Sequence, residues 1–260
     1  CRLHFEEGPW KGDSWGTRPD TRGPYYQPEP WSETNRIASV LQTVLDSATP
    51  EDAAALLQAM HRNRIESSDA LDRMLRLASS NEQLLGMAIA QLASASDIPP
   101  DGVELLLKAA RKKDASPTVL ANAVAALVKV NAPQAPLAML TALSALDASQ
   151  NAANEQNRAR ALFVRSRALE SLVTTYDDVA NSKAHHGEAT NEGLWADVAL
   201  LSVASRPDAS PESSVAARQA IERAWQQTQR RGRLIRAAVK IDNHYLDEKI
   251  LAARADQDVA

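Results

Sequence analysis

The histidines are the first residues to consider for chemistry, because histidine is the usual metal ligand and proton carrier near neutral pH. His185 and His186 are adjacent, with Glu188 close by. Neighbouring side chains seldom point the same way, and no HExxH or similar ligand spacing occurs. We therefore interpret this pair as solvated loop histidines. His61 stands at the expected end of a helix, where the helix dipole favours a cation, and we give it a structural role.

Two arginines, Arg158 and Arg165, are spaced seven residues apart. On a single long helix, predicted over about 154–180, they share an apolar stripe with Leu162 and Leu169. An arginine on an apolar stripe must pair or extend its charged end to water. One interpretation is an ion pair with an acid on the neighbouring helix. The other is a surface that binds an acidic partner.

A second group of arginines, Arg230, Arg231, Arg233 and Arg236, is the densest positive cluster. It surrounds Gly232, so the pattern predicts a helix break with side chains that cap carbonyls and face water. Changing one of these arginines is expected to cost under ~0.5 kcal/mol of stability. No aromatic residues interleave with the cluster, as they do in nucleic-acid platforms. The chain has 29 Lys+Arg, 33 Asp+Glu and a net charge of −4, which also gives no basic footprint.

Two phosphate-binding signatures are missing from the sequence. It has no GxxxxGK[ST] loop and no GxGxxG after a strand. One cysteine excludes an intrachain disulfide, a CxxC pair, a multi-cysteine zinc site and a CxxCH haem attachment. No run of about 18 apolar residues could span a membrane. We expect no catalytic, cofactor-binding or metal-binding residue in this chain.

Cys1 admits two interpretations. It could be the lipid-bearing first residue of a processed lipoprotein, or the start of a fragment cut from a longer chain. The residues that follow it lack the Ser/Gly-rich tether usual after a lipidated cysteine, which favours the fragment.

From Ser32 onward the sequence predicts helix after helix, with apolar residues at i, i+3, i+4 and i+7. Capping residues, three of them followed by proline, mark the expected starts at Thr49-Pro50, Asn81, Ser116-Pro117 and Ser210-Pro211. The predicted buried residues include Ile37, Val40, Leu41, Val44, Leu45, Leu120, Val124, Leu127, Leu137, Leu140, Val215, Ile221 and Trp225.

Over residues 32–150 the predicted helix starts recur at roughly 15–19 residues. Short loops make successive helices antiparallel neighbours, and stacked pairs form an α-solenoid. We predict an all-α, HEAT-like solenoid that continues over 151–260 with longer helices and one inserted polar loop at 181–193. Residues 1–31 are rich in proline, glycine and aromatic residues, which predicts an irregular linker whose aromatics pack on the first helices or on a preceding domain.

The linker also carries a resemblance. The run Trp15-Gly16-Thr17-Arg18-Pro19-Asp20-Thr21-Arg22-Gly23-Pro24-Tyr25-Tyr26, followed by Trp31 and Glu33-Thr34, resembles a linker in the very large extracytoplasmic proteins of Planctomycetes and their relatives. That family joins a glucose/sorbosone-dehydrogenase-like β-propeller, a HEAT-like helical region and a C-terminal c-type cytochrome domain. The resemblance is specific over about residues 10–36 and architectural elsewhere.

The resemblance implies that this chain is the helical middle of an extracytoplasmic haem-containing oxidoreductase. Its role would be a non-catalytic scaffold that holds or docks the flanking domains, with haem c only in the C-terminal domain. The alternative is a free-standing HEAT-like adaptor for a protein partner, with a lipid anchor at Cys1. The expected domain seam, or else a local packing site on the first repeat, comprises Trp15, Arg18, Asp20, Arg22, Tyr25 and Tyr26.

Overall fold

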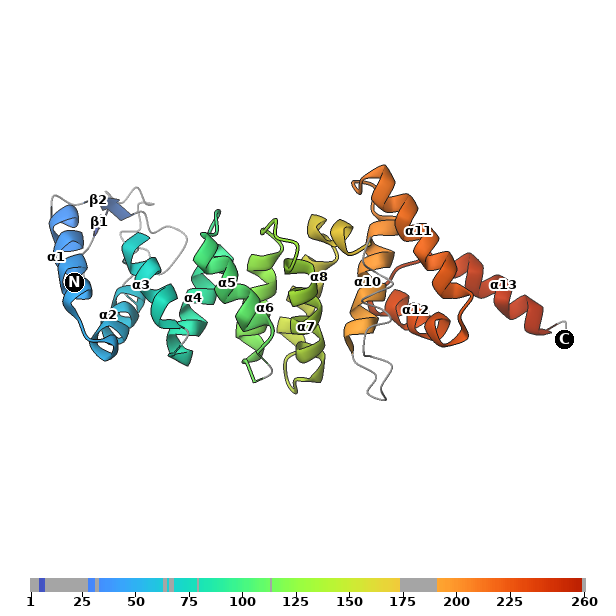
Figure 1. Cartoon of the computed structure of the whole chain (residues 1–260), viewed down its shortest axis with the longest axis horizontal. Helices are drawn as coiled ribbons and strands as arrows, with labels where there is room; N and C mark the ends of the chain where they lie inside the picture. The colour runs from blue at the N-terminus through green and yellow to red at the C-terminus, as the bar shows by residue number, and fades with distance from the viewer. Residues whose placement is uncertain are drawn as a thin grey trace, which may run out of the picture. The chain divides into compact units, whose positions relative to one another are not determined.

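The computed structural model describes the following residues: 5–7, 28–30, 33–62, 65, 68–78, 80–112, 114–173 and 191–258. Over these residues the fold is helical apart from one short strand pair, which confirms the all-α part of the prediction (Figure 1). The chain divides into two compact units, Cys1–Ala88 and Ile89–Ala260. The predicted change to longer helices near residue 150 lies inside the second unit.

The first unit contains the helices α1 (Thr34–Ser47), α2 (Pro50–Arg62) and α3 (Ser68–Ala78), and the start of α4 (Glu82–Ser94). Helix α3 packs against both α1 and α2. The buried side chains of this unit include Leu41, Leu45, Leu57, Met60, Met74, Leu75 and Leu84.

Two helix starts in the first unit are fixed by the caps that the sequence predicts. The Thr49 hydroxyl accepts a hydrogen bond from the Asp52 backbone N–H at 3.2 Å and donates to the Asp52 carboxylate at 2.9 Å. The Asn81 side-chain oxygen accepts from the Leu84 N–H at 3.1 Å. Each bond satisfies a donor that the first helical turn leaves without a partner.

Two short segments of residues 1–31 are described, and both are extended. Strands β1 (Phe5–Glu7) and β2 (Pro28–Pro30) pair antiparallel, with Glu6 opposite Glu29. Proline is tolerated in an edge strand when its missing N–H faces away from the partner strand. In a strand, the N–H groups of alternate residues point to the same side. The N–H groups missing at Pro28 and Pro30 therefore belong to one side of β2, and the opposite side can pair with β1.

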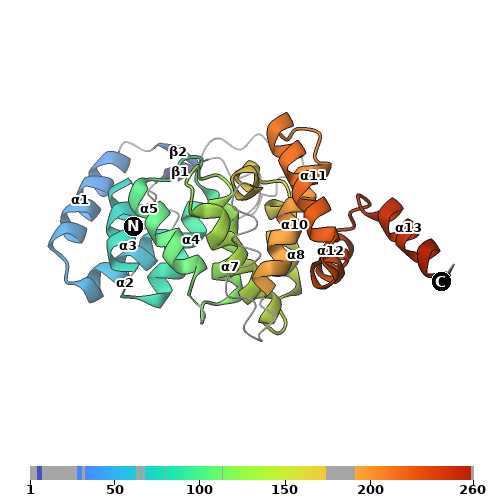
Figure 2. The ribbon, with the colours of Figure 1, turned by 45° about the vertical axis from the view of Figure 1, so that its right-hand side comes forward.

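The second unit is built around α6 and α10. Helix α6 packs against α5, α7 and α8, and α10 packs against α7, α11 and α12 (Figures 1 and 2). The bounds are α5 Pro100–Ala110, α6 Pro117–Leu127, α7 Ala135–Ala148, α8 Ala153–Phe163, η1 Arg167–Leu169 (a 3₁₀ helix), α10 Asn191–Ser205, α11 Pro211–Trp225, α12 Thr228–Lys240 and α13 Asp247–Asp258.

Small residues let the helices of this unit approach closely. A Cβ at Gly102 of α5 would lie 3.0 Å from a methyl of Leu92 and 3.3 Å from a methyl of Ile98.

The predicted starts of α6 and α11 are confirmed, because the hydroxyls of Ser116 and Ser210 accept hydrogen bonds from the backbone N–H groups three residues further on.

Four residues predicted to be buried are exposed. The exposed fractions are 56% for Val40, 49% for Val44, 41% for Leu137 and 54% for Val215. The predicted period is correct, but a periodic stripe is wider than the strip that a neighbouring helix covers. In α1, for example, the covered strip runs through Leu41 and Leu45 and leaves the flanking valines outside.

The single helix predicted over 154–180 is wrong. Helix α8 ends at Phe163, and the backbone is extended at Ser166 before η1 begins. The turn brings Leu169 into the core, where it is fully buried. Most of the predicted polar loop at 181–193 lies outside the described residues, and α10 already begins at Asn191.

The helix break predicted at the arginine cluster is also wrong. Helix α11 ends at Trp225, and α12 begins at Thr228 and runs through Gly232 without interruption. A glycine costs a helix interior only about 1 kcal/mol, which tertiary contacts readily outweigh. Those contacts involve the arginines themselves, since Arg233 pairs with Asp197 of α10.

Candidate functional site

Most of the residues singled out in the N-terminal linker lie outside the described residues. This holds for Trp15, Arg18, Asp20, Arg22, Tyr25 and Tyr26, and for Cys1, His185 and His186. The two arginines expected on one interaction stripe, Arg158 and Arg165, are both described.

Arg158 and Arg165 do not share a helical face. Arg158 lies on α8, is exposed, and donates to the side-chain oxygen of Asn122 on α6. Arg165 lies in the turn after α8 and is exposed. The interpretation that pairs Arg158 with an acid is therefore wrong, because its partner is an amide. Because α8 ends at Phe163, between the two arginines, the seven-residue spacing does not place them on one helical stripe.

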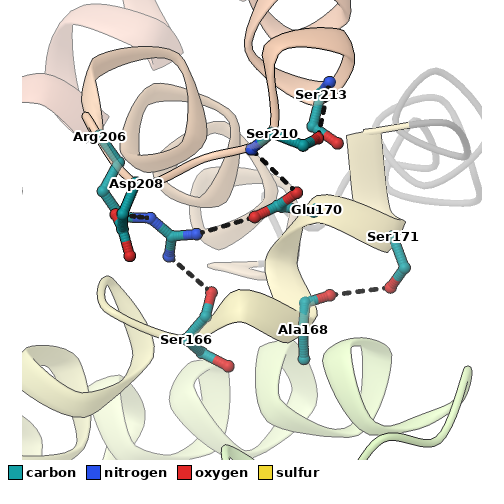
Figure 3. A network of polar contacts seen from close by, with 8 residues as sticks. All are labelled: Ser166, Ala168, Glu170, Ser171, Arg206, Asp208, Ser210 and Ser213. Carbon is teal, nitrogen blue, oxygen red and sulfur yellow. Dashed lines mark hydrogen bonds and ion pairs between the residues drawn. The ribbon is translucent and has the colours of Figure 1, made fainter.

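A polar network that the sequence did not indicate joins the turn after α10 to the segment around η1 (Figure 3). We call it the Glu170 network: Ser166, Glu170, Arg206, Asp208 and Ser210. The Arg206 guanidinium donates to the Ser166 carbonyl at 2.8 Å and pairs with the Glu170 carboxylate at 3.2 Å and the Asp208 carboxylate at 3.0 Å. The second oxygen of Glu170 accepts from the Ser210 N–H at 3.3 Å.

The surroundings of Glu170 favour its ionised form. Burial raises the pKa of Glu170, but hydrogen bonds from Ser210 and Ser213 and the positive charge of Arg206 lower it by more. The pKa of this carboxyl therefore lies below its usual value. One carboxylate thus contacts both ends of the turn between α10 and α11.

A second network surrounds Trp195, which is buried on α10. Its indole N–H donates to the Asp147 carboxylate of α7 at 2.9 Å, and the Lys240 ammonium of α12 pairs with the same carboxylate at 3.1 Å. The ammonium also lies 4.9 Å from the centre of the Trp195 ring, and Phe163 of α8 meets that ring edge-on at 5.6 Å. Arg160 completes the network by donating to the Lys240 carbonyl at 2.9 Å.

The third polar feature is the ion pair of Asp197 on α10 with Arg233 on α12. Asp197 is 0% exposed, and both of its oxygens face the guanidinium, at 2.5 Å from Nε and 3.3 Å from Nη2. Gly193 lies one helical turn before Asp197, and a Cβ there would come within 2.7 Å of the Arg233 Nη1. The missing side chain of Gly193 therefore makes room for the guanidinium.

The arginine cluster does not face water as predicted. Arg230 is buried and Arg233 is paired with a buried acid. Arg231 lies over the Trp225 ring at 5.3 Å and donates to the Trp225 carbonyl at 3.0 Å. Of the four, Arg236 is the exposed one. The cluster is largely a packing face of α12, because Arg230 is buried and Arg233, one helical turn on, pairs with Asp197 of α10.

One of these acids carries a signal that sequence reasoning could have used. Asp197 is a lone charge within the apolar run Trp195–Ala204. An acid in the middle of a run that must be buried has to be paired, because burying an isolated charge is costly. Glu170 has no such signal, since the polar residues around it resemble any exposed helix face.

The arrangement uses its charges to join helices. Within the described ranges, no group of three or more His, Cys, Asp or Glu side chains is placed to share a metal ion. Among the same residues, no helix combines the length and the apolar character that crossing a bilayer requires.

Comparison of the chain with protein-family models, with curated proteins and with solved structures found no match. The resemblance of residues 10–36 to the planctomycete linker therefore stays a prediction.

Proposed function

We propose that the chain is a non-catalytic helical-repeat scaffold that links or docks other domains. The observation that carries the proposal is the use of one buried and two half-buried acids. Asp147, Glu170 and Asp197 each pair with a cation from another helix or turn of the second unit. Acids placed in this way position helices against one another, which is the requirement of a rigid spacer.

The order of helix packing supports a HEAT-like α-solenoid as the form of this scaffold. In a solenoid each repeat contacts its neighbours along the chain. In the second unit α6 contacts α5, α7 and α8, and α10 contacts α7, α11 and α12. Most of these partners are one or two helices apart in chain order, which is the pattern expected of stacked repeats, while α7 and α10 meet across α8 and η1.

The context of the scaffold rests on the sequence resemblance. In this proposal the chain holds a propeller domain and a c-type cytochrome domain apart in an extracytoplasmic oxidoreductase. The haem would belong to the cytochrome domain, and this chain would bind no cofactor. The seam with the flanking domains would use Trp15, Arg18, Asp20, Arg22, Tyr25 and Tyr26, with the exposed Arg158 and Arg165 as further contacts.

Two measurements test the linking role. The reading frame after Ala260 should encode a CxxCH motif, and a frame that stops within a few codons would contradict the proposal. Cross-linking and mass spectrometry of the parent polypeptide should then connect exposed lysines of the second unit, such as Lys108 and Lys129, to the flanking domains. A parent protein without such cross-links would also count against it.

A second candidate is a free-standing adaptor that binds a protein partner. Val239 on α12 and Leu251 on α13, whose apolar side chains are exposed, are residues that such a partner would cover. This candidate predicts a lipobox immediately before Cys1 and no further domain in the reading frame. Turnover of sugars by the purified chain with an added electron acceptor would contradict both candidates.

A further inference from the structure

The turn between α10 and α11 has no buried apolar side chain to hold it. In residues 206–210, Pro207 and Asp208 are exposed and the other three residues are half-buried. A segment without apolar anchors keeps its place through its polar contacts. For this turn, contacts of that kind run to Ser166 and Glu170.

The segment on the other side of those contacts is anchored differently. Leu169, Leu172 and Val173 are buried, and η1 packs against α7 and α10. These apolar contacts do not depend on the charge of Glu170. If the polar contacts are lost, the segment over 166–173 stays on the core while the turn is released.

Glu170 contacts the turn at both of its ends. One carboxylate oxygen pairs with Arg206, where α10 has just ended, and the other accepts from the N–H of Ser210, the residue that caps α11 (Figure 3). We propose that Glu170 is a latch: its ionised carboxylate holds the α10–α11 turn and the first turn of α11 in place, and loss of that charge releases them while the core of the unit stays folded. This inference goes beyond the scaffold role and does not depend on it.

The groups around the carboxylate set the direction of the pH response. Arg206 faces it from the end of α10, and the neutral donors Ser210 and Ser213 face it from α11. Asp208 of the turn faces Arg206 from the other side, and Glu212 in the first turn of α11 is exposed.

These neighbours determine whether acid strengthens or weakens the latch. Because the pKa of Glu170 is lowered below its usual value of 4.5, the latch contributes fully above that value. Its contribution is lost as the pH falls through the lower pKa of the folded state. The latch is therefore closed at neutral pH and opens in acid.

Hydrogen exchange measured by mass spectrometry on the full chain tests the latch. At pH 7, Glu170→Gln should speed exchange in peptides over 206–213 by roughly three- to tenfold, because a charge-assisted hydrogen bond becomes a neutral one. Peptides over 117–127 in α6 should exchange as in the wild type. The matched control is Glu212→Gln, which removes an exposed acid nearby and should change nothing.

A pH series of the wild type gives an independent arm that needs no variant to fold. With exchange rates corrected for their intrinsic pH dependence, protection over 206–213 should hold at every pH above 4.5, the usual value for this carboxyl, and should be lost below it while α6 stays protected. Loss of protection in the turn above that pH, or loss in the turn and in α6 together, would overturn the proposal. So would unchanged exchange in Glu170→Gln, or an equal effect of Glu212→Gln.

Discussion

Helices α6 and α12 lie in the same unit and are held there by different forces. Helix α6 buries an almost purely apolar surface made of Leu120, Ala121, Ala123, Val124, Ala126 and Leu127. Helix α12 buries Leu234, Ala237 and Ala238, but it also pairs Arg233 with Asp197 and Lys240 with Asp147. The placement of α6 thus depends on shape and hydrophobic burial, whereas that of α12 depends on specific charged partners.

The contrast has an energetic consequence. Apolar packing weakens gradually as atoms are removed, because each methylene contributes separately. A buried ion pair fails abruptly, because removing one partner leaves the other charge without compensation. Removing one buried side chain from each helix should therefore lower the free energy of unfolding for different reasons.

The largest effect is expected from Asp197→Ala. The substitution leaves the Arg233 guanidinium, only 16% exposed, beside α10 without its carboxylate, and the free energy of unfolding should fall by about 3–5 kcal/mol. Urea denaturation followed by circular dichroism measures the loss. The control Asp208→Ala removes an acid that is 51% exposed and should cost under about 1 kcal/mol. Equal costs for the two variants would mean that the buried pair does not hold α12.

The large cost expected at Asp197 also changes the expectation for its partner Arg233 in the arginine cluster. The sequence predicted under ~0.5 kcal/mol for any of the four arginines, which assumed that all of them face water. For Arg233 the assumption is wrong, because α12 continues through Gly232 and turns this side chain toward α10.

The second effect tests the apolar helix. Leu127→Ala in α6 should cost roughly 2–5 kcal/mol, because Leu127 is fully buried and the cavity can relax only in part. Leu137→Ala in α7 is the matched control, since that leucine is 41% exposed, and it should cost under about 1 kcal/mol. Midpoints of urea denaturation give both values. A larger cost at Leu137 would mean that the covered face of α7 has been assigned incorrectly.

The helix starts were predictable because a cap involves residues only three apart. Thr49, Asn81, Ser116 and Ser210 all cap the helices expected of them. The width of the buried strip was not predictable, because it depends on which neighbour covers each helix. Val40 and Leu137 carry the right period and lie just outside the covered area.

The polar networks were beyond local reasoning for a different reason. Arg233 and Asp197 are 36 residues apart, and Lys240 and Asp147 are 93 apart. No periodicity relates such positions, so only the packed helices show that the charges meet. The lone acid at Asp197 within an apolar run is the one local sign, and it indicates that a partner exists without saying which residue it is.

A smaller net effect is expected when both members of the buried pair become apolar. The double variant Asp197→Leu with Arg233→Leu removes the uncompensated charge and adds apolar surface, so its stability should lie within about 2 kcal/mol of the wild type. The same denaturation assay measures it beside Asp197→Ala. If the double variant were as unstable as the single one, the loss would come from the shape of the site and not from its charge.

The smallest effects come from two glycines and should have opposite signs. A Cβ at Gly232 in α12 meets nothing within 4 Å, so Gly232→Ala should stabilise the protein by about 0.5–1 kcal/mol through helix propensity alone. A Cβ at Gly193 in α10 would lie 2.7 Å from the Arg233 Nη1 and would push the guanidinium off Asp197. The loss from weakening the Arg233–Asp197 ion pair should exceed the gain in helix propensity that alanine brings. Gly193→Ala should therefore destabilise the protein by about 1 kcal/mol. Thermal unfolding of the two variants measures the difference, and a gain at both positions would show that Arg233 can move aside without loss.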